Sequence, residues 1–233
     1  MSSDLLAAPK ATRLLMELCR KHGIDTWHAR NSLRAPLYQR LTCDIVKRVA
    51  TLDSRIVEVG CGVGDILIRL AEIGFCNLLG IERDPGVHSV ATERAKALGF
   101  GYIELRRGNY PIRLEIRSNV LLQINCMYFD DLTNRDEFGC ALRRWSHFNG
   151  ESDVFLVETV DSSYTSLEHT RFPGKPTEFN PHCRVSQADM KSFFPEYHLW
   201  QVPSSEPTRV PKTIFLISKH DYGISLEDLM TPV

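Results

Sequence analysis

The glycine-rich stretch from Arg55 to Asp65 constrains this chain more than any other part of its sequence. A short apolar run, residues 56–59, breaks into a loop with glycine at positions 60, 62 and 64, and a second apolar run begins at Ile66. Glycine at alternate positions lets the backbone turn tightly and lets a ligand approach main-chain N–H groups that no side chain shields. The stretch therefore predicts a strand, a ligand-binding turn and the start of a helix, whose N-terminus adds a partial positive charge.

Two carboxylates accompany this loop. Glu58 lies just before it, and the next strand-like run, residues 77–82, ends in Glu82. In nucleotide-binding α/β folds, a carboxylate roughly 20 residues beyond the first glycine accepts hydrogen bonds from a ribose. Glycine turns that bind nothing are common, so this second acidic position is what turns the loop into a predicted nucleotide site.

The pattern Glu58-x-Gly60-x-Gly62-x-Gly64 followed by Glu82 resembles the first motif and the next acidic position of class I S-adenosylmethionine-dependent methyltransferases. The competing interpretation is a nicotinamide-dependent dehydrogenase, whose G-x-G-x-x-G loop places the third glycine one residue later. An acidic residue at the helix start, residue 65, would also repel the pyrophosphate of a dinucleotide, whereas a sulfonium cofactor carries no phosphate. The spacing therefore favours a methyltransferase.

The resemblance implies S-adenosyl-L-methionine as the cofactor and S-adenosyl-L-homocysteine as its product. It places the glycine loop against the amino-acid half of the cofactor, Glu82 on both ribose hydroxyls and Arg83 beside the adenine. Asn109 could hydrogen-bond the adenine amino group, although a simple Gly-Asn turn explains it equally well. The cofactor-binding residues expected on this basis are Glu58, Gly60, Cys61, Gly62, Gly64, Glu82, Arg83, Asn109, Tyr110 and Asn125.

Strand-like and helix-like runs alternate along the middle of the chain. Such alternation indicates a parallel sheet with right-handed crossovers. Together with the resemblance, it predicts a doubly wound α/β fold with a seven-stranded, mostly parallel sheet whose last strand is antiparallel. The expected strands are 56–60, 77–82, 102–106, 119–125, 153–160, 197–202 and 213–218, and the expected helices between them are 65–73, 86–97, 134–148 and 186–194.

Two further helices are predicted before the first strand, over residues 4–22 and 36–50, with a polar segment around a tryptophan between them. Helices in this position resemble the lid of the methyltransferase family. The expected organisation is an N-terminal helical lid at 1–50, a methyltransferase domain at 51–220 and a tail at 221–233. Residues 161–185 contain three prolines and few periodic apolar residues, so they are expected to form a substrate-side loop insertion.

Ligands of open α/β sheets bind beyond the carboxyl ends of the strands. Asn125 takes the family's fourth-motif position, close to the transferred methyl group, but Cys126 and Met127 stand where nucleobase amino-methyltransferases have prolines. A small acceptor is therefore favoured. Histidine titrates near neutrality and could remove a proton from a hydroxyl acceptor. The candidate catalytic residues are Asn125, His169 and His182. The candidate acceptor-binding residues are Trp27, His28, Tyr38, Tyr128, Glu158, Asp161 and Tyr164. Trp27 could equally be a packing anchor between two helices.

Composition narrows the partners. The net charge is -1, and basic pairs are scattered among acids in the sequence, so a nucleic-acid acceptor is disfavoured. The seven cysteines form no C-x-x-C pair, and the adjacent His182 and Cys183 do not make a cluster with the spacing of metal ligands, so no metal site is expected. With no signal peptide or membrane-length apolar run evident, a cytoplasmic monomer or homodimer is expected.

The predicted activity is methyl transfer to oxygen or nitrogen of a small, aromatic or heterocyclic molecule. The alternatives are a peptide, protein or RNA acceptor, or a non-catalytic subunit of the same fold.

Overall fold

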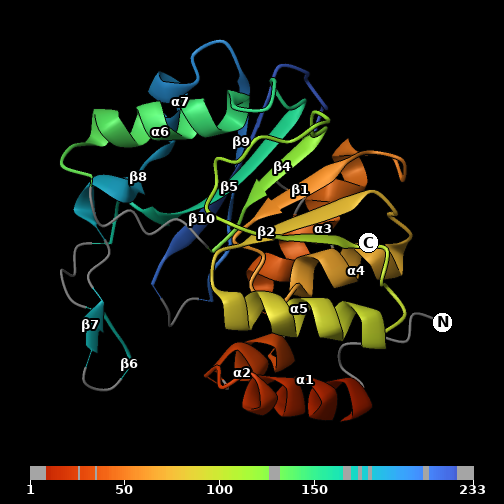
Figure 1. Ribbon diagram of the computed structural model, residues 1–233. Coiled ribbons are helices and arrows are strands. Elements are labelled where there is room, and N and C mark those ends of the chain that lie inside the picture. The colour runs from red at the N-terminus through yellow and green to blue at the C-terminus, as the bar shows by residue number, and fades with distance from the viewer. Residues whose placement is uncertain are drawn as a thin grey trace.

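The structure is a computed structural model that describes residues 9–25, 27–34, 36–125, 132–164, 169–172, 175–177, 180–206 and 210–224. Within these ranges a mixed β-sheet lies between two layers of helices (Figure 1). The strand order is β3-β2-β1-β4-β5-β10-β9, in which the first five strands are parallel and β10 is antiparallel to both of its neighbours. The predicted doubly wound sheet with an antiparallel last strand is confirmed.

The seven strands on this path are short and mostly buried. They are β1 (Ile56–Val59), β2 (Leu78–Glu82), β3 (Glu104–Arg107), β4 (Val120–Gln123), β5 (Val154–Asp161), β9 (His198–Pro203) and β10 (Lys212–Ser218). A further two-residue strand, β8 (Arg184–Val185), pairs with the end of β5, and β6 (His169–Phe172) pairs with β7 (Lys175–Thr177) in a separate ribbon.

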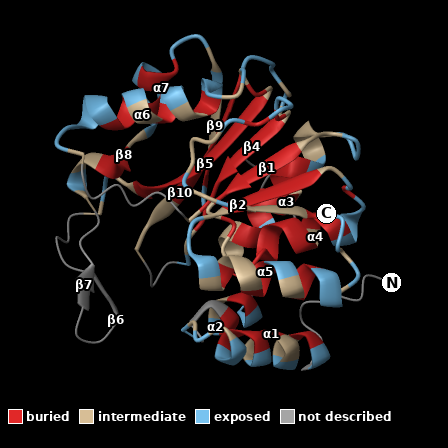
Figure 2. Cartoon of the chain, viewed as in Figure 1, coloured by how far each residue is buried: buried red, intermediate tan, exposed pale blue. Residues whose placement is uncertain are grey.

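Helices cover both faces of the sheet, so the strands are apolar on both sides, as parallel strands are. On one face α3 and α4 pack through residues such as Ile45 and Leu67, and on the other α6 and α7 pack through Phe138 and Met190. Figure 2 shows the strands buried between these layers. The helices are α1 (Pro9–Lys21), α2 (Trp27–Leu33), α3 (Leu37–Val49), α4 (Asp65–Ile73), α5 (Pro85–Ala97), α6 (Arg135–His147) and α7 (Gln187–Phe193).

Two segments differ from the sequence-based expectation. The polar segment around residue 27 forms the seven-residue helix α2, whose buried Ala29 packs in one cluster with Leu15 of α1 and Val90 of α5. A helix of this length is too short to show a helical repeat in the sequence. Residues 161–185, expected as a loop, contain β6, β7 and β8, and these strands are likewise too short to show alternation.

None of the described helices is both long enough and apolar enough to cross a membrane.

Candidate functional site

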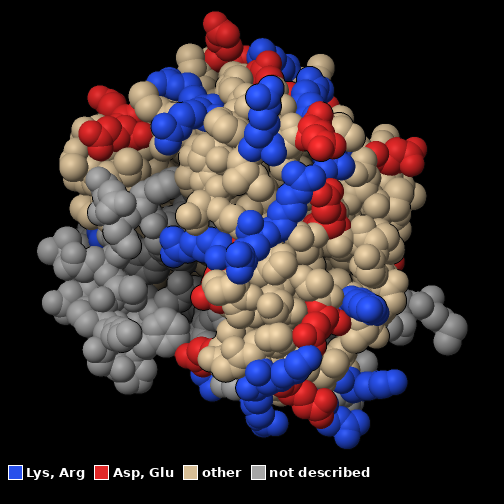
Figure 3. Space-filling view, viewed as in Figure 1, with Lys and Arg blue, Asp and Glu red and all other residues tan. Residues whose placement is uncertain are grey.

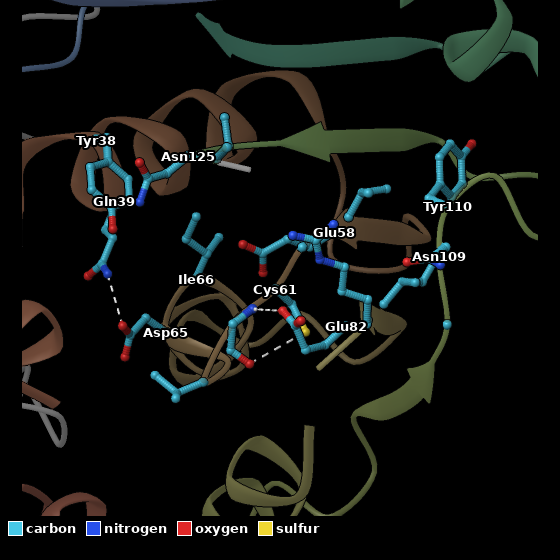
Figure 4. Close-up of a pocket in the computed structure, with 18 of the residues that line it drawn as sticks. Tyr38, Gln39, Glu58, Cys61, Asp65, Ile66, Glu82, Asn109, Tyr110 and Asn125 are labelled. Atoms are coloured by element: carbon cyan, nitrogen blue, oxygen red, sulfur yellow. Dashed lines mark hydrogen bonds between the residues drawn. The ribbon is translucent and has the colours of Figure 1, made fainter. Parts of the chain in front are cut away.

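A cavity of about 510 Å³ lies at the carboxyl ends of the parallel strands, where the strand order reverses between β1 and β4. Doubly wound folds bind ligands at this switch point. Figure 4 draws Tyr38, Gln39 and Asn125 at one end of the cavity, Asn109 and Tyr110 at the other, and Glu58 between them. The cavity therefore brings together side chains that follow β1, β2, β3 and β4 and side chains from the N-terminal helices.

The glycine loop forms the floor of this cavity. The main-chain N–H of Gly60 donates to the carbonyl of Ile81 at 2.8 Å, which holds the loop against the end of β2. Gly62 has a φ of +56°, and a Cβ built there would meet no atom within 4 Å. Gly80 is the opposite case, because a Cβ there would come within 2.7 Å of the Cys61 sulfur. Glycine is thus required at 80 for close packing, whereas Gly62 leaves open space in which a ligand can approach the backbone.

Glu82 ends β2 at the edge of the cavity and stabilises the loop. Its Oε2 accepts from the main-chain N–H of Gly62 at 3.0 Å, and its Oε1 accepts from the N–H of Asp84 at 2.9 Å. Both carboxylate oxygens retain further lone pairs after these bonds. The carboxylate predicted to bind the ribose is therefore fixed beside the glycine loop and is part of the cavity lining.

Glu58 is buried in the centre of the cavity wall, with 3% of its surface exposed. Its Oε2 has no hydrogen-bond partner. Burial raises the pKa of this carboxyl well above its ordinary value, and the negative charges of Asp65 and Glu82 raise the pKa further. An unpartnered buried polar atom is rare in native proteins. This one lines a cavity that holds two other acids, so the site favours a positively charged ligand.

Asp65, the first residue of α4, is the centre of a buried polar network. Its carboxylate accepts from Arg94 of α5 at 2.7 Å, from Ser32 of α2 at 2.6 Å and from the side-chain amide of Gln39 of α3 at 3.0 Å. Arg94 also donates to the carbonyl of Val63 in the loop. The sequence alone suggested that Asp65 is an uncompensated negative charge, but it is ion-paired with Arg94. Its carboxylate also links α2 and α3 to the glycine loop.

The N-terminal helices also close one end of the cavity. Asn31 of α2 donates to the hydroxyl of Tyr38 of α3 at 2.8 Å, and both residues line the cavity together with Gln39. Burial raises the pKa of the Tyr38 hydroxyl, and the charges of Asp65 and Glu158 raise it further. Tyr38 was predicted as an acceptor-binding residue and lies at the cavity. Asn31 and Gln39 were missed, because neither belongs to a recognisable motif.

The opposite end of the cavity lies beyond β2 and β3, where the resemblance places the adenine. Arg83, Asn109 and Tyr110 all line it. The Tyr110 ring packs edge-on against Trp145 of α6, and its hydroxyl donates to the Trp145 carbonyl at 2.8 Å. Burial raises the pKa of Tyr110 to about 12. Trp145 was not predicted, since it reaches this end from a helix remote in sequence.

Beside Asn125, at the end of β4, lies an ion pair of Lys212 and Glu158, neither of which is among the residues that line the cavity. Asn125 lines the cavity, and its Oδ1 accepts from the Lys212 ammonium at 2.5 Å. Lys212 begins β10 and also pairs with Glu158 of β5 at 3.4 Å, whose second oxygen accepts from Ser204 at 2.5 Å. Glu158 was predicted near the acceptor, but sequence reasoning missed Lys212, which the antiparallel pairing of β10 with β5 brings here.

Several predicted residues do not line this cavity. Asp161 accepts hydrogen bonds from Ser163 and Thr213, and Tyr164 packs beneath the Arg184 guanidinium. The main-chain N–H of His182 donates to the side-chain oxygen of Asn180. Gly64 lies at the start of α4 with a φ of +80°. Tyr128 lies outside the described residues, as do the side chains of Trp27, His28 and His169. The predicted acceptor and base roles of these residues stay predictions.

Basic and acidic side chains are less evenly mixed on the viewed surface than the scattered basic pairs of the sequence suggested. Figure 3 shows Lys and Arg side chains gathered in a band across the middle of the viewed face, over the region of β2 and β3, with acidic side chains at its borders. Exposed arginines of these strands and the segment after them include Arg83, Arg107 and Arg113.

Among the described residues, no three His, Cys, Asp or Glu side chains come together in a way that could hold a metal ion.

Comparison with known proteins supports the fold. No protein-family model matches the chain. Residues of this chain are 26% identical to the ribosomal protein L11 methyltransferase of Clostridium botulinum (strain Eklund 17B / Type B) over 99 residues, which are 40% of this chain and 32% of that protein. The chain thus spans about one third of the length of this curated relative.

Two solved structures are similar over most of the chain. Magnesium protoporphyrin IX methyltransferase from Synechocystis PCC 6803, solved with bound S-adenosylhomocysteine, superposes with a TM-score of 0.61 and 12% identity over 87% of this chain and 93% of that one. An S-adenosylmethionine-dependent methyltransferase from Clostridium acetobutylicum ATCC 824 gives a TM-score of 0.56 and 12% identity over 80% of this chain and 94% of that one. The chain has the class I methyltransferase fold.

Proposed function

We propose that this chain binds S-adenosyl-L-methionine in the cavity and transfers its methyl group to oxygen or nitrogen of a small, aromatic or heterocyclic molecule. The observation that carries the proposal is the pairing of open space at Gly62 with the unpartnered, buried carboxyl of Glu58. The cofactor carries a sulfonium and an ammonium group, and the cavity offers carboxylates to both. Its volume, about 510 Å³, lies within the roughly 300–1,000 Å³ of small-molecule sites.

The residues present fit this cofactor along the whole cavity. Glu58 and the glycine loop would hold the amino-acid half, Glu82 the ribose hydroxyls, and Asn109 with Tyr110 the adenine. When bound, the cofactor supplies a methyl carbon activated by the positive sulfur. The protein then has to align an acceptor atom with that carbon and exclude water, and such alignment alone lowers the barrier by several kcal/mol, roughly 7–11 in well-oriented systems.

The alternative acceptor is a peptide, a protein or RNA. The name of the curated relative, a ribosomal protein L11 methyltransferase, favours a protein, and the basic band of Figure 3 would suit a polyanion. Against both, the described residues form one α/β layer structure with N-terminal helices and contain no separate recognition domain. A non-catalytic role is disfavoured because the glycine loop, Glu58 and Glu82 together line one open cavity.

The test is calorimetric titration with S-adenosylhomocysteine, with NAD as the control. We expect micromolar binding of the former alone. Methyl transfer from labelled S-adenosylmethionine is then compared for three pools: aromatic and heterocyclic small molecules, ribosomal proteins, and RNA. Transfer confined to the protein or RNA pool would overturn the small-molecule proposal. Absence of S-adenosylhomocysteine binding by folded protein would overturn the cofactor assignment itself.

A further inference from the structure

The charged side chains that line the cavity are mostly acidic. Among the described lining residues, Glu58, Asp65 and Glu82 are acids, and Arg83, which follows β2, is the single basic residue. The proposed cofactor has a carboxylate as well as an ammonium in its amino-acid half. A carboxylate that leaves water needs hydrogen-bond donors in its site. Away from Arg83, those donors have to be uncharged groups.

The order of groups along the cavity places this carboxylate near the N-terminal helices. Figure 4 draws Asn109 and Tyr110 at one end of the cavity, Glu58 between the ends, and Tyr38 with Gln39 at the other end. A cofactor with its adenine at the first end and its ammonium beside Glu58 extends the remainder of its amino-acid half toward Tyr38. The donors available at that end therefore decide how the carboxylate is held.

Tyr38 has a hydroxyl hydrogen that its neighbours do not use. Its oxygen accepts from Nδ2 of Asn31 at 2.8 Å. Burial and nearby negative charges raise the pKa of this hydroxyl, and hydrogen bonds from the side chains of Asn31 and Gln39 act against that rise. The raised pKa keeps the hydroxyl protonated at neutral pH. Because an amide N–H₂ group only donates, the O–H of Tyr38 is left to donate to a third group.

The direction of the Gln39 amide is fixed by Asp65. Nε2 of Gln39 donates to Oδ2 of Asp65 at 3.0 Å, and an ionised carboxylate only accepts. Asp65 is in turn ion-paired with Arg94 at 2.7 Å and accepts from Ser32 at 2.6 Å. This ion pair has two effects. It holds the amide nitrogen of Gln39 in place, and it compensates the charge of Asp65, so that a second carboxylate is tolerated at this end of the cavity.

Resting on the proposed function, we propose that the O–H of Tyr38 donates to the carboxylate of the cofactor's amino-acid half, and that Asn31 and Gln39 are positioning residues that direct this O–H. The ammonium is left to Glu58 and the glycine loop. The two charged groups of the amino acid are then recognised by different parts of the chain, the positive group by the end of β1 and the negative group by α2 and α3. This assigns Tyr38 to the cofactor instead of the methyl acceptor.

The test compares two ligands that differ in this one group. S-adenosylhomocysteine has both the ammonium and the carboxylate, whereas its decarboxylated analogue, S-adenosyl-3-thiopropylamine, keeps the adenine, ribose, sulfur and ammonium. Calorimetry measures the Kd of both ligands for the wild type and for Tyr38→Phe, which removes only the hydroxyl. We expect Tyr38→Phe to bind S-adenosylhomocysteine roughly tenfold to a hundredfold more weakly, the size of a lost hydrogen bond to a charged group. The affinity for the analogue is expected to stay within about twofold.

Three outcomes are distinguished by these titrations. Equal weakening of both ligands in Tyr38→Phe would overturn the contact with the carboxylate. Unchanged affinity for both, with a raised KM for the methyl acceptor, would return Tyr38 to the acceptor and overturn the inference. Failure of the wild type to bind either ligand would instead overturn the proposed function. Tyr102→Phe is the matched control, since Tyr102 is 50% exposed, does not line the cavity and donates to the carbonyl of Phe75.

Asn31→Ala tests the positioning of the hydroxyl. This variant removes the amide that donates to Tyr38 but leaves the O–H itself, so we expect a loss of several-fold in affinity for S-adenosylhomocysteine and little change for the analogue. In the double variant with Tyr38→Phe, Asn31→Ala is expected to cause no further loss, because the two residues act through one contact. Additive losses, or equal losses for both ligands, would show that Asn31 does not act through Tyr38.

Discussion

Arg94 and Asp65 form a buried ion pair, 2.7 Å apart, that joins α5 to the first residue of α4. The side chains are 2% and 11% exposed. Asp65 also accepts from Ser32 and Gln39, so a single carboxylate fixes two helices that precede the sheet onto the loop that follows β1. The end of the cavity lined by α2 and α3 thus depends for its shape on an ion pair that no group of the proposed cofactor would contact.

Removing one partner of this pair is expected to destabilise the protein strongly. In Arg94→Met, Asp65 would remain buried without its counter-charge, which typically costs about 3–5 kcal/mol of unfolding free energy. Chemical denaturation monitored by circular dichroism measures the change. Arg117→Met is the control, because Arg117 pairs with Asp153 but has 50% of its side chain exposed, and the expected loss there is at most about 1 kcal/mol. Similar losses in the two variants would contradict a structural role for the buried pair.

Gly62→Ala separates backbone strain from loss of binding space. The φ of +56° costs alanine roughly 1 kcal/mol or more of stability, and the new methyl group would occupy the open space on the cavity side. We expect S-adenosylhomocysteine affinity to fall at least tenfold. Gly23→Ala provides a matched control, since Gly23 has a φ of +65° and equally open surroundings but does not line the cavity. It is expected to lose similar stability and keep its affinity, and calorimetry with a thermal melt checks both variants.

Glu82→Ala is expected to weaken S-adenosylhomocysteine binding by tenfold or more, because each hydrogen bond to a charged group contributes about 1.5–3 kcal/mol. The side chain also holds the N–H of Gly62, so part of the loss will come from a less ordered loop. Glu104→Ala, on the neighbouring strand β3, removes an acid that pairs with Arg55 and Arg106 outside the cavity. Unchanged affinity in Glu82→Ala, or equal losses in both variants, would place the ribose elsewhere.

The sequence predicted the parts of the site that are carried by local patterns. The glycine loop, Glu58 and Glu82 occur within two adjoining strand-turn units, and the turn chemistry of such units depends on near neighbours. Asn125 was found in the same way, from its position after a recognisable strand. For these residues, the spacing along the chain is sufficient to indicate the position in space.

The residues that sequence reasoning missed are brought to the site by long-range packing. Lys212 reaches Asn125 only because β10 runs antiparallel to β5, in the register that pairs Lys212 with Val160. Arg94 lies within α5, where a basic residue predicts a solvated position, yet it is 1% exposed and completes the network of Asp65. Neither contact leaves a signal in a single sequence, because each partner is an ordinary polar or charged residue remote from the other in the chain.

The raised pKa of Glu58 predicts that the free energy of unfolding depends on pH. Its pKa is raised in the folded protein above the ordinary value of 4.5, so between these two values the folded chain holds a proton that the unfolded chain has lost. The contribution of Glu58 is therefore fully present at acidic pH and is lost as pH rises through the raised pKa. Glu58→Gln removes this dependence. We expect the melting temperature of the variant to fall less than that of the wild type as pH rises above the ordinary carboxyl range.

The same group predicts proton release when the cofactor binds. A sulfonium and an ammonium near Glu58 favour its ionised form, which lowers its pKa and expels the proton that burial and the charges of Asp65 and Glu82 had retained. Calorimetric titrations in buffers of different ionisation enthalpy measure that proton. We expect more release with S-adenosylmethionine than with S-adenosylhomocysteine, which lacks the sulfonium charge, and little in Glu58→Gln. Equal release by the variant and the wild type would mean that another group supplies the proton and that the cationic half of the cofactor does not lie against Glu58.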